Sequence, residues 1–211
     1  MNKILDKVKS FFKSNLEIIN PTAVLTVICI VVTLARSSAN LLTQSKIEAL
    51  TVKTQNEAMA KVLEGEYNEV TKTVNNNEIT YHTVTKESRV IGYIFIINTN
   101  GYGGTVSVMT AVNSDGTVAA VQILDASNET PGLGQNVTKE NFYTQFAGMT
   151  KNINVIKGGA ANSENNEINA VTGATISSKA VTGAVNTALD YAAEIIAEAE
   201  EELNNSKGDL Y

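Results

Sequence analysis

Cysteine and histidine are almost absent from this chain of 211 residues, which contains one of each, Cys29 and His82. A single cysteine cannot form a disulfide within the chain. One cysteine with one histidine also cannot build an iron–sulfur cluster or a multi-histidine metal site. A Cys–His nucleophilic pair would need Cys29 outside a membrane, and its apolar surroundings argue against that. We interpret His82 as a surface or strand-edge residue. Any redox chemistry would therefore need an organic cofactor.

Positive charge is also scarce, because 16 Lys and Arg face 22 Asp and Glu, for a net charge of -6. This balance argues against nucleic-acid binding through neutralisation of phosphates. The length allows one domain plus an anchor.

The N-terminal part of the chain predicts a membrane anchor. Residues 1–17 are basic on balance and fit either a short amphipathic helix on a membrane surface or a frayed end. Residues 18–42 are long and apolar enough to cross a bilayer, and Ala23–Ala35 carries no charge. Because the lysines precede this span, we expect a cytoplasmic N-terminus and an extracytoplasmic domain over residues 43–211. The alternative is a cleaved signal peptide, processed near Ser37–Ala39.

Beyond the anchor, the patterns predict an α+β domain with an antiparallel sheet and flanking helices. Ser45 and Glu48 have capping-box spacing at the start of its first helix, and Asp115–Gly116 is a strong hairpin signal. Residues 71–89 are polar, with a turn at 75–77. The last helix ends in an acidic stretch that should fray. The predicted helices cover 43–64, Phe142–Met149 and Ser178–Leu203, and the predicted strands cover Val90–Ile97, Thr105–Val112, Thr117–Leu124 and Ile153–Ile156.

Three loops carry the candidate chemistry. Asn169–Ser178 is small and hydroxyl-rich, and it stands directly before the last helix, where free backbone N–H groups favour a phosphate. The same pattern also fits simple capping by Ser177 or Ser178. Asn100–Gly104 has three glycines that let the backbone approach a ligand, although a flexible hairpin tip would look alike. In Asn128–Gly134, a Pro-Gly pair fits a type II turn.

All three loops resemble a known family, the second through residues 101–104 (Gly-Tyr-Gly-Gly), which lead into a strand that the Asp-Gly hairpin follows. Residues 172–175 (Thr-Gly-Ala-Thr) resemble the signature of the FMN-binding domain in G subunits of Rnf electron-transport complexes. Residues 129–134 (Glu-Thr-Pro-Gly-Leu-Gly) resemble the family's second hallmark, which lines the flavin pocket. The resemblance implies an FMN joined to Thr175 by a phosphoester, which a separate flavin transferase makes. This chain has Asn169 where the family usually has Asp, and Ala-Ser-Asn at 126–128 where a His is frequent.

The resemblance further implies an electron-transfer subunit of a membrane complex that couples ferredoxin oxidation and NAD+ reduction to ion movement. Other membrane and redox subunits would be its partners, and no metal site or catalytic residue is expected on this chain. Because Ala23–Leu34 contains no acidic residue, we expect that the chain does not itself bind the ion. The implied cofactor-binding residues are Tyr102, Gly103, Glu129, Thr130, Leu133, Gly134, Lys157, Thr172, Gly173, Ala174 and Ser178.

Three alternatives stay open. The C subunit of the sodium-translocating NADH:quinone reductase carries the same two motifs, usually in a longer chain. A stand-alone membrane-anchored flavin carrier would also share them. In a different class, a non-enzymatic anchored binding module would use residues 172–175 only to cap the last helix.

Overall fold

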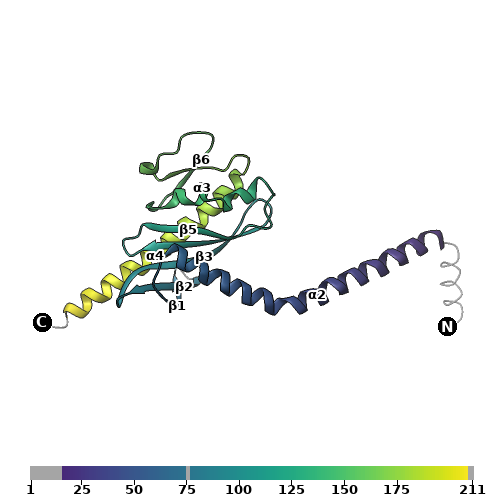
Figure 1. Cartoon of the computed structure of the whole chain (residues 1–211), viewed down its shortest axis with the longest axis horizontal. Helices are drawn as coiled ribbons and strands as arrows, with labels where there is room; N and C mark the ends of the chain where they lie inside the picture. The colour runs from purple at the N-terminus through teal and green to yellow at the C-terminus, as the bar shows by residue number, and fades with distance from the viewer. Residues whose placement is uncertain (1–15, 75–76, 209–211) are drawn as a thin grey trace, which may run out of the picture. The chain divides into compact units, whose positions relative to one another are not determined.

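A long helix, α2 (Leu16–Val62), begins the part of the chain that the computed structural model describes, which is residues 16–74 and 77–208 (Figure 1). The chain divides into two units, Met1–Val52 and Lys53–Tyr211. The predicted basic N-terminal segment lies outside the described residues, except for its last two positions.

In the first unit, α2 contains a stretch that is long and apolar enough to cross a membrane, as predicted. Asn20–Ser38 has a mean hydropathy of 1.6, and its side chains are exposed. The hydroxyls of Thr26 and Thr33 donate to backbone carbonyls four residues earlier, at 2.8 and 2.6 Å. Hydrogen bonds of this kind satisfy a polar side chain within its own helix, which lowers its cost in lipid. Cys29 is exposed inside this stretch.

The helix predicted over residues 43–64 is confirmed as far as Val62, but its predicted start is wrong, because α2 is continuous from Leu16. Ser45 and Glu48 therefore lie inside a helix, where the backbone N–H groups already have intrahelical partners and need no cap. Residues 36–50 contain neither glycine nor proline. No residue in that segment breaks the helix, so the capping-box spacing was misleading.

The second unit is built on a five-stranded antiparallel sheet in which neighbouring strands follow one another along the chain. The strands predicted at 90–97, 105–112 and 117–124 are confirmed as the last three. At the hairpin between the final two, Gly116 has a φ of 83°, as the Asp-Gly signal requires. The strands are β1 (Glu66–Val74), β2 (Asn77–Lys86), β3 (Arg89–Asn100), β4 (Thr105–Asn113) and β5 (Val118–Asp125).

The first two strands were not predicted, because residues 71–89 are polar and contain a turn signal. Their Thr and Val content favours strands, and outer strands tolerate polar side chains on an exposed face. His82 of β2 pairs with Glu69 of β1 and Ile94 of β3. It therefore lies half-buried on an interior strand and not at a sheet edge.

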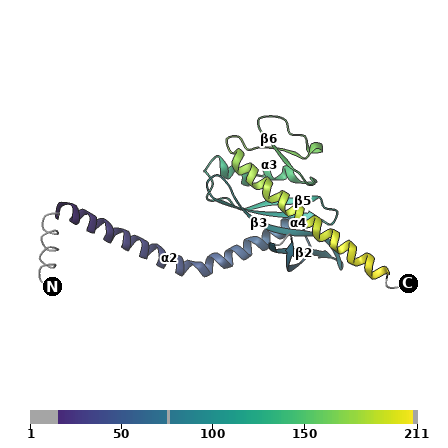
Figure 2. The same ribbon diagram turned by 180° about the vertical axis from the view of Figure 1, so that it is seen from behind.

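Both faces of the sheet are covered. The last helix, α4 (Thr175–Gly208), lies along one face and packs against β3 and β4 (Figures 1 and 2). On β3, Tyr93 and Phe95 join the core beneath α4, whereas Ile94 joins a second core with Met59 and Val62 from the end of α2. Burial on both faces explains why β3 is a nearly continuous apolar run.

The remaining elements form a smaller layer that leads into α4. They are η1 (Gly134–Thr138), α3 (Glu140–Tyr143), η2 (Thr144–Phe146), β6 (Asn154–Ile156), η3 (Ser163–Asn165) and β7 (Glu167–Asn169). The helix predicted at 142–149 is α3 with η2, and its core residues Phe142, Phe146 and Met149 are buried as expected. The parallel pairing of β6 with β7 was not predicted.

Helix α4 has the predicted apolar face, which is buried from Val181 to Ile195. Its bounds differ from the prediction at both ends. It starts at Thr175, so neither Ser177 nor Ser178 is the N-cap. It also continues through the acidic stretch to Gly208, beyond the predicted end at Leu203. Part of that stretch is held by an ion pair between Glu198 and Lys72 of β1.

Candidate functional site

Loops from four parts of the second unit enclose a pocket of about 490 Å³. Tyr102 follows β3, and Lys157 follows β6. Residues 129–134, which we call the hallmark turn, stand between β5 and the start of η1 and supply further lining residues. The N-terminus of α4 closes the pocket. The volume lies within the range of 300–1,000 Å³ that is common for small-molecule sites. The lining residues are Tyr102, Glu129, Thr130, Leu133, Gly134, Lys157, Gly173, Ala174, Thr175, Ile176 and Ser177.

Three hydroxyls stand at the start of α4, and only one is placed for modification. The Ser177 hydroxyl is buried and donates to Glu129 Oε2 at 2.7 Å. The Ser178 hydroxyl is buried and donates to the Ala174 carbonyl at 2.9 Å, while it accepts from Val171 N–H at 3.0 Å. Thr175 is half-buried, lines the pocket and has no hydrogen bond from its hydroxyl to any described residue. A reaction partner in the pocket could therefore reach the Thr175 hydroxyl but not the hydroxyls of the two serines.

The hallmark turn is held in place by its own residues. Leu133 N–H donates to the Thr130 carbonyl at 3.1 Å, and Gly132 has a φ of 75°. This is the geometry of a type II turn with proline and glycine at its centre, as predicted. The turn brings Leu133 to the mouth of the pocket, where its side chain is 46% exposed.

Glu129 is the only charged residue among the fully buried positions of the described chain, with 2% of its surface exposed. Its Oε1 accepts from Gly103 N–H at 3.2 Å, and its Oε2 accepts from the Ser177 hydroxyl. Each of its two oxygens therefore has a hydrogen-bond partner from a different segment of the chain. The side chain thus connects the loop after β3 with the first turn of α4.

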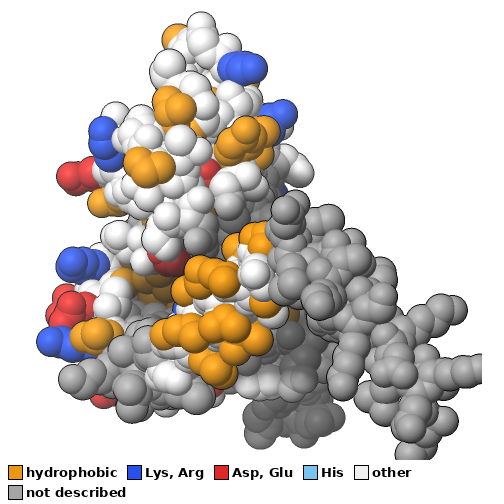
Figure 3. All heavy atoms as spheres, turned by 90° about the vertical axis from the view of Figure 1, so that its right-hand side faces the viewer, with side chains coloured by type: hydrophobic (Ala, Val, Ile, Leu, Met, Phe, Trp, Pro, Cys, Tyr) orange, Lys and Arg blue, Asp and Glu red, His pale blue; other side chains and the backbone are white. Residues whose placement is uncertain are grey.

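The pocket combines features that suit a phosphorylated, planar ligand. The first residues of α4 have N–H groups without intrahelical partners, and the helix dipole favours an anion there. Lys157 adds a cation to the wall, and Tyr102, Leu133 and Ile176 add exposed apolar surface. Figure 3 shows a face of the molecule on which hydrophobic side chains gather in groups and charged ones are scattered. No group of His, Cys, Asp and Glu within the described residues could hold a metal ion.

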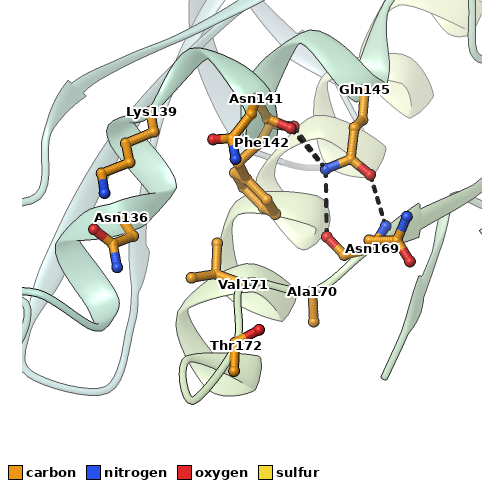
Figure 4. Close-up of a pocket in the computed structure, with 9 residues that line it drawn as sticks. All are labelled: Asn136, Lys139, Asn141, Phe142, Gln145, Asn169, Ala170, Val171 and Thr172. Atoms are coloured by element: carbon orange, nitrogen blue, oxygen red, sulfur yellow. Dashed lines mark hydrogen bonds between the residues drawn. The ribbon is translucent and has the colours of Figure 1, made fainter. Parts of the chain in front are cut away.

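A second, more polar pocket of about 360 Å³ lies between the α3 segment and residues 169–172 (Figure 4). Its Gln145 amide pairs with the Asn169 backbone in both directions, accepting at 2.8 Å and donating at 3.4 Å. The Asn169 side chain uses Oδ1 to accept from Ala161 N–H at 3.2 Å. Thr172 lines this pocket and not the first one.

The structure therefore brings most of the predicted cofactor-binding residues to one pocket. Three predicted residues do not line it, because Gly103 lies behind Glu129, Thr172 faces the second pocket and Ser178 caps the preceding loop. Ile176 and Ser177 line it and were missing from the predicted set. Placing the helix start at Thr175 instead of Ser178 would have found them, since both then fall in the first turn of the helix, next to the pocket.

Comparison with known proteins points in one direction. Residues 101–190 match the FMN-binding domain family. The G subunit of the proton-translocating ferredoxin:NAD(+) oxidoreductase complex of Clostridium ljungdahlii is 32% identical over 166 residues, which cover 79% of this chain and 86% of that protein. The G subunit of the Na(+)-translocating ferredoxin:NAD(+) oxidoreductase complex of Acetobacterium woodii is 42% identical over 99 residues, which cover 46% of this chain and 47% of that protein.

Among solved structures, the C subunit of the Na(+)-translocating NADH-quinone reductase from Parabacteroides distasonis is similar with a TM-score of 0.49 and 23% identity. The match covers 56% of this chain and 63% of that one. Both sequence relatives described above are named as G subunits, and the Clostridium protein matches most of the present chain. On this evidence the chain belongs to the G subunits of ion-translocating oxidoreductase complexes and contains their FMN-binding domain.

Proposed function

We propose that this chain carries one FMN, joined by a phosphoester to Thr175 Oγ, and passes electrons within a membrane-bound, ion-translocating ferredoxin:NAD+ oxidoreductase complex. On its own it would be an electron carrier and would not turn over NAD+. The bound flavin supplies the redox chemistry, and the protein sets its position, its access and its surroundings. The coupling ion is left open, because one relative is named for protons and another for sodium.

The observation that carries this proposal is the position of Thr175. It is the first residue of α4, it lines the pocket that both hallmark motifs share, and its hydroxyl has no competing hydrogen bond within the described chain. In the attached state its Oγ would bond to phosphorus. The phosphate oxygens would then lie close to the unpaired N–H groups of the first turn. Lys157 would offset part of the negative charge of the phosphate or of the reduced ring.

A covalent bond also makes physical sense if the domain lies outside the cytoplasm, as we propose. A flavin held only by noncovalent contacts would dissociate into an effectively unlimited volume, and mass action would empty the site. A phosphoester prevents that loss whatever the intrinsic affinity. In this topology residues 1–17 are cytoplasmic and the stretch around Asn20–Ser38 is the single span. The partners would be the flavin transferase and the other subunits of the complex.

The test is intact-protein mass spectrometry with fragmentation, on full-length protein produced together with a flavin transferase. Attachment forms a bond between Thr175 Oγ and phosphorus and breaks the bond from that phosphorus to a leaving group on the flavin donor. The leaving group takes up the proton lost from Thr175, and the protein gains the mass of one FMN less one water. We expect this gain to map to Thr175 and to disappear in Thr175→Ala. Thr175→Ser, which keeps a hydroxyl, should retain flavin, and Thr187→Ala on the same helix should behave as wild type. Flavin that stays on denatured Thr175→Ala would refute the assignment.

Asn169 allows a second test of flavin attachment. If the transferase reads the carboxylate that the family usually has here, Asn169→Asp should speed flavin attachment. The Asp side chain can still accept from Ala161 N–H, so the local fold should persist. Equal attachment rates for the two proteins would show that Asn is fully tolerated. A colourless, unmodified wild-type protein in the presence of transferase would instead favour the anchored binding module.

A further inference from the structure

Glu129 has surroundings that its role in the hallmark turn does not require. It is buried beside the pocket, and none of the ion pairs formed by the described residues includes it. Burying a carboxylate without a cationic partner is costly, and hydrogen bonds recover only part of that cost. Such a cost is typical of residues that a site needs for its function.

The space around this carboxylate is created by glycines on two different segments. A Cβ atom at Gly101 would overlap Glu129 Oε1, and a Cβ at Gly134 would overlap Oε2. Neither glycine has a positive φ, so the backbone conformation does not call for glycine at these positions. The absent side chains make room for Glu129 between the loop after β3 and the start of η1.

We propose that Glu129 is the positioning residue of the flavin pocket. Its carboxylate holds the loop around Gly103, the hallmark turn and the first turn of α4 together, and its negative charge lowers the reduction potential of the bound flavin. Only the effect on the reduction potential rests on the proposed function. The positioning role concerns the protein without flavin.

Glu129 and Ser177 both line the pocket, and the Ser177 hydroxyl already donates to the carboxylate. Reduction adds electrons to the ring, and a nearby carboxylate in a partly dry site opposes that added charge. Lys157 is the cation on the same wall, but its side chain is exposed, so water screens its charge.

The first measurement uses full-length, flavin-free protein in detergent. Amide hydrogen exchange of residues 100–104 should rise at least about tenfold in Glu129→Ala, because Gly103 N–H loses its acceptor. Glu129→Gln keeps one acceptor oxygen and should exchange like wild type. Glu164→Ala, at an exposed glutamate outside the pocket, is the matched control. Unchanged exchange in folded Glu129→Ala would overturn the positioning role.

The second measurement uses flavin-loaded protein and the near-isosteric Glu129→Gln, which avoids a folding defect. We expect the midpoint potential to rise by about 30 mV, which is a tenfold change in the reduced-to-oxidised ratio of a two-electron couple. A wild-type potential in Glu129→Gln with flavin on Thr175 would overturn the charge role and leave the proposed function standing. Wild-type protein that takes up no flavin would overturn the charge role and the proposed function together, while the exchange result would still decide the positioning role.

Discussion

Replacing Gly134 by alanine tests the packing around Glu129 without touching Glu129 itself. The three atoms nearest to the added Cβ all belong to this glutamate, and besides Oε2 they are its Cβ and Cδ, each at 3.0 Å. The carboxylate would have to move, and the hydrogen bond from the Ser177 hydroxyl at 2.7 Å would be lost or stretched. The perturbation therefore acts through a single neighbouring side chain.

The expected magnitude follows from two costs and one gain. Overpacking a tight site costs about 1–3 kcal/mol, and losing a hydrogen bond to a charged group costs about 1.5–3 kcal/mol. Alanine at an unstrained glycine position returns roughly 0.4–1 kcal/mol through the unfolded chain. We expect Gly134→Ala to lower the free energy of unfolding by about 1.5–5.5 kcal/mol. For a unit of this size that corresponds to a fall in Tm of roughly 3–22 °C.

A double-mutant cycle isolates the cause. In the Glu129→Ala background the overlap with Oε2 and Cδ is gone, and only the contact with Cβ at 3.0 Å remains. Gly134→Ala should then cost less than about 1 kcal/mol, so the coupling between the two sites is about 2 kcal/mol. Thermal unfolding of all four full-length proteins, followed by circular dichroism, measures it. An equal cost of Gly134→Ala in both backgrounds would refute the packing argument.

Three further predictions address the core, the pH dependence and the span. Leu189→Ala, at a 1% exposed position of α4, should destabilise the second unit by about 2–5 kcal/mol in urea unfolding. Burial raises the pKa of Tyr81 and Tyr93 above 10.0 in the folded chain, so the unfolded chain ionises first. The contribution of these two neutral tyrosines to the free energy of unfolding should be fully present below about pH 10 and should be lost as the pH rises through the folded pKa. Replacing either tyrosine by Phe should make this loss of stability smaller. Because Ala23–Leu34 has no acidic residue, Thr33→Val in an assembled, flavin-loaded complex should leave ion transport unchanged, and its loss would contradict this reasoning.

Local chemistry predicted those parts of the molecule whose conformation depends on near neighbours in sequence. The Asp-Gly pair at 115–116 specified a hairpin because glycine accepts a positive φ, and Thr117 fixes the turn by donating to the Asp115 carboxylate at 2.7 and 2.9 Å. These two bonds also lower the pKa of Asp115. The hydropathy of the first long helix likewise indicated a span without reference to any partner.

The errors arose where distant contacts outweigh local preference. Strands β1 and β2 are polar, and they join the sheet through pairing, because β2 pairs with β3 and β1 pairs with β2. The start of α4 was misplaced by three residues, because two serines looked like caps when their hydroxyls in fact bond to Glu129 and to the preceding loop. In each case the deciding partner lies outside the segment from which the prediction was made.

The sequence by itself determined the family, the presence of an apolar span and the two motifs that mark the flavin domain, because each is carried by a short run of residues. Only the tertiary structure decided which hydroxyl is accessible and what surrounds it. Glu129 is 26 residues from Gly103 and 48 from Ser177 along the chain, yet it bonds to both. Burial of the two serines and exposure of Thr175 follow from that packing, since a side chain becomes inaccessible only when remote parts of the chain close over it.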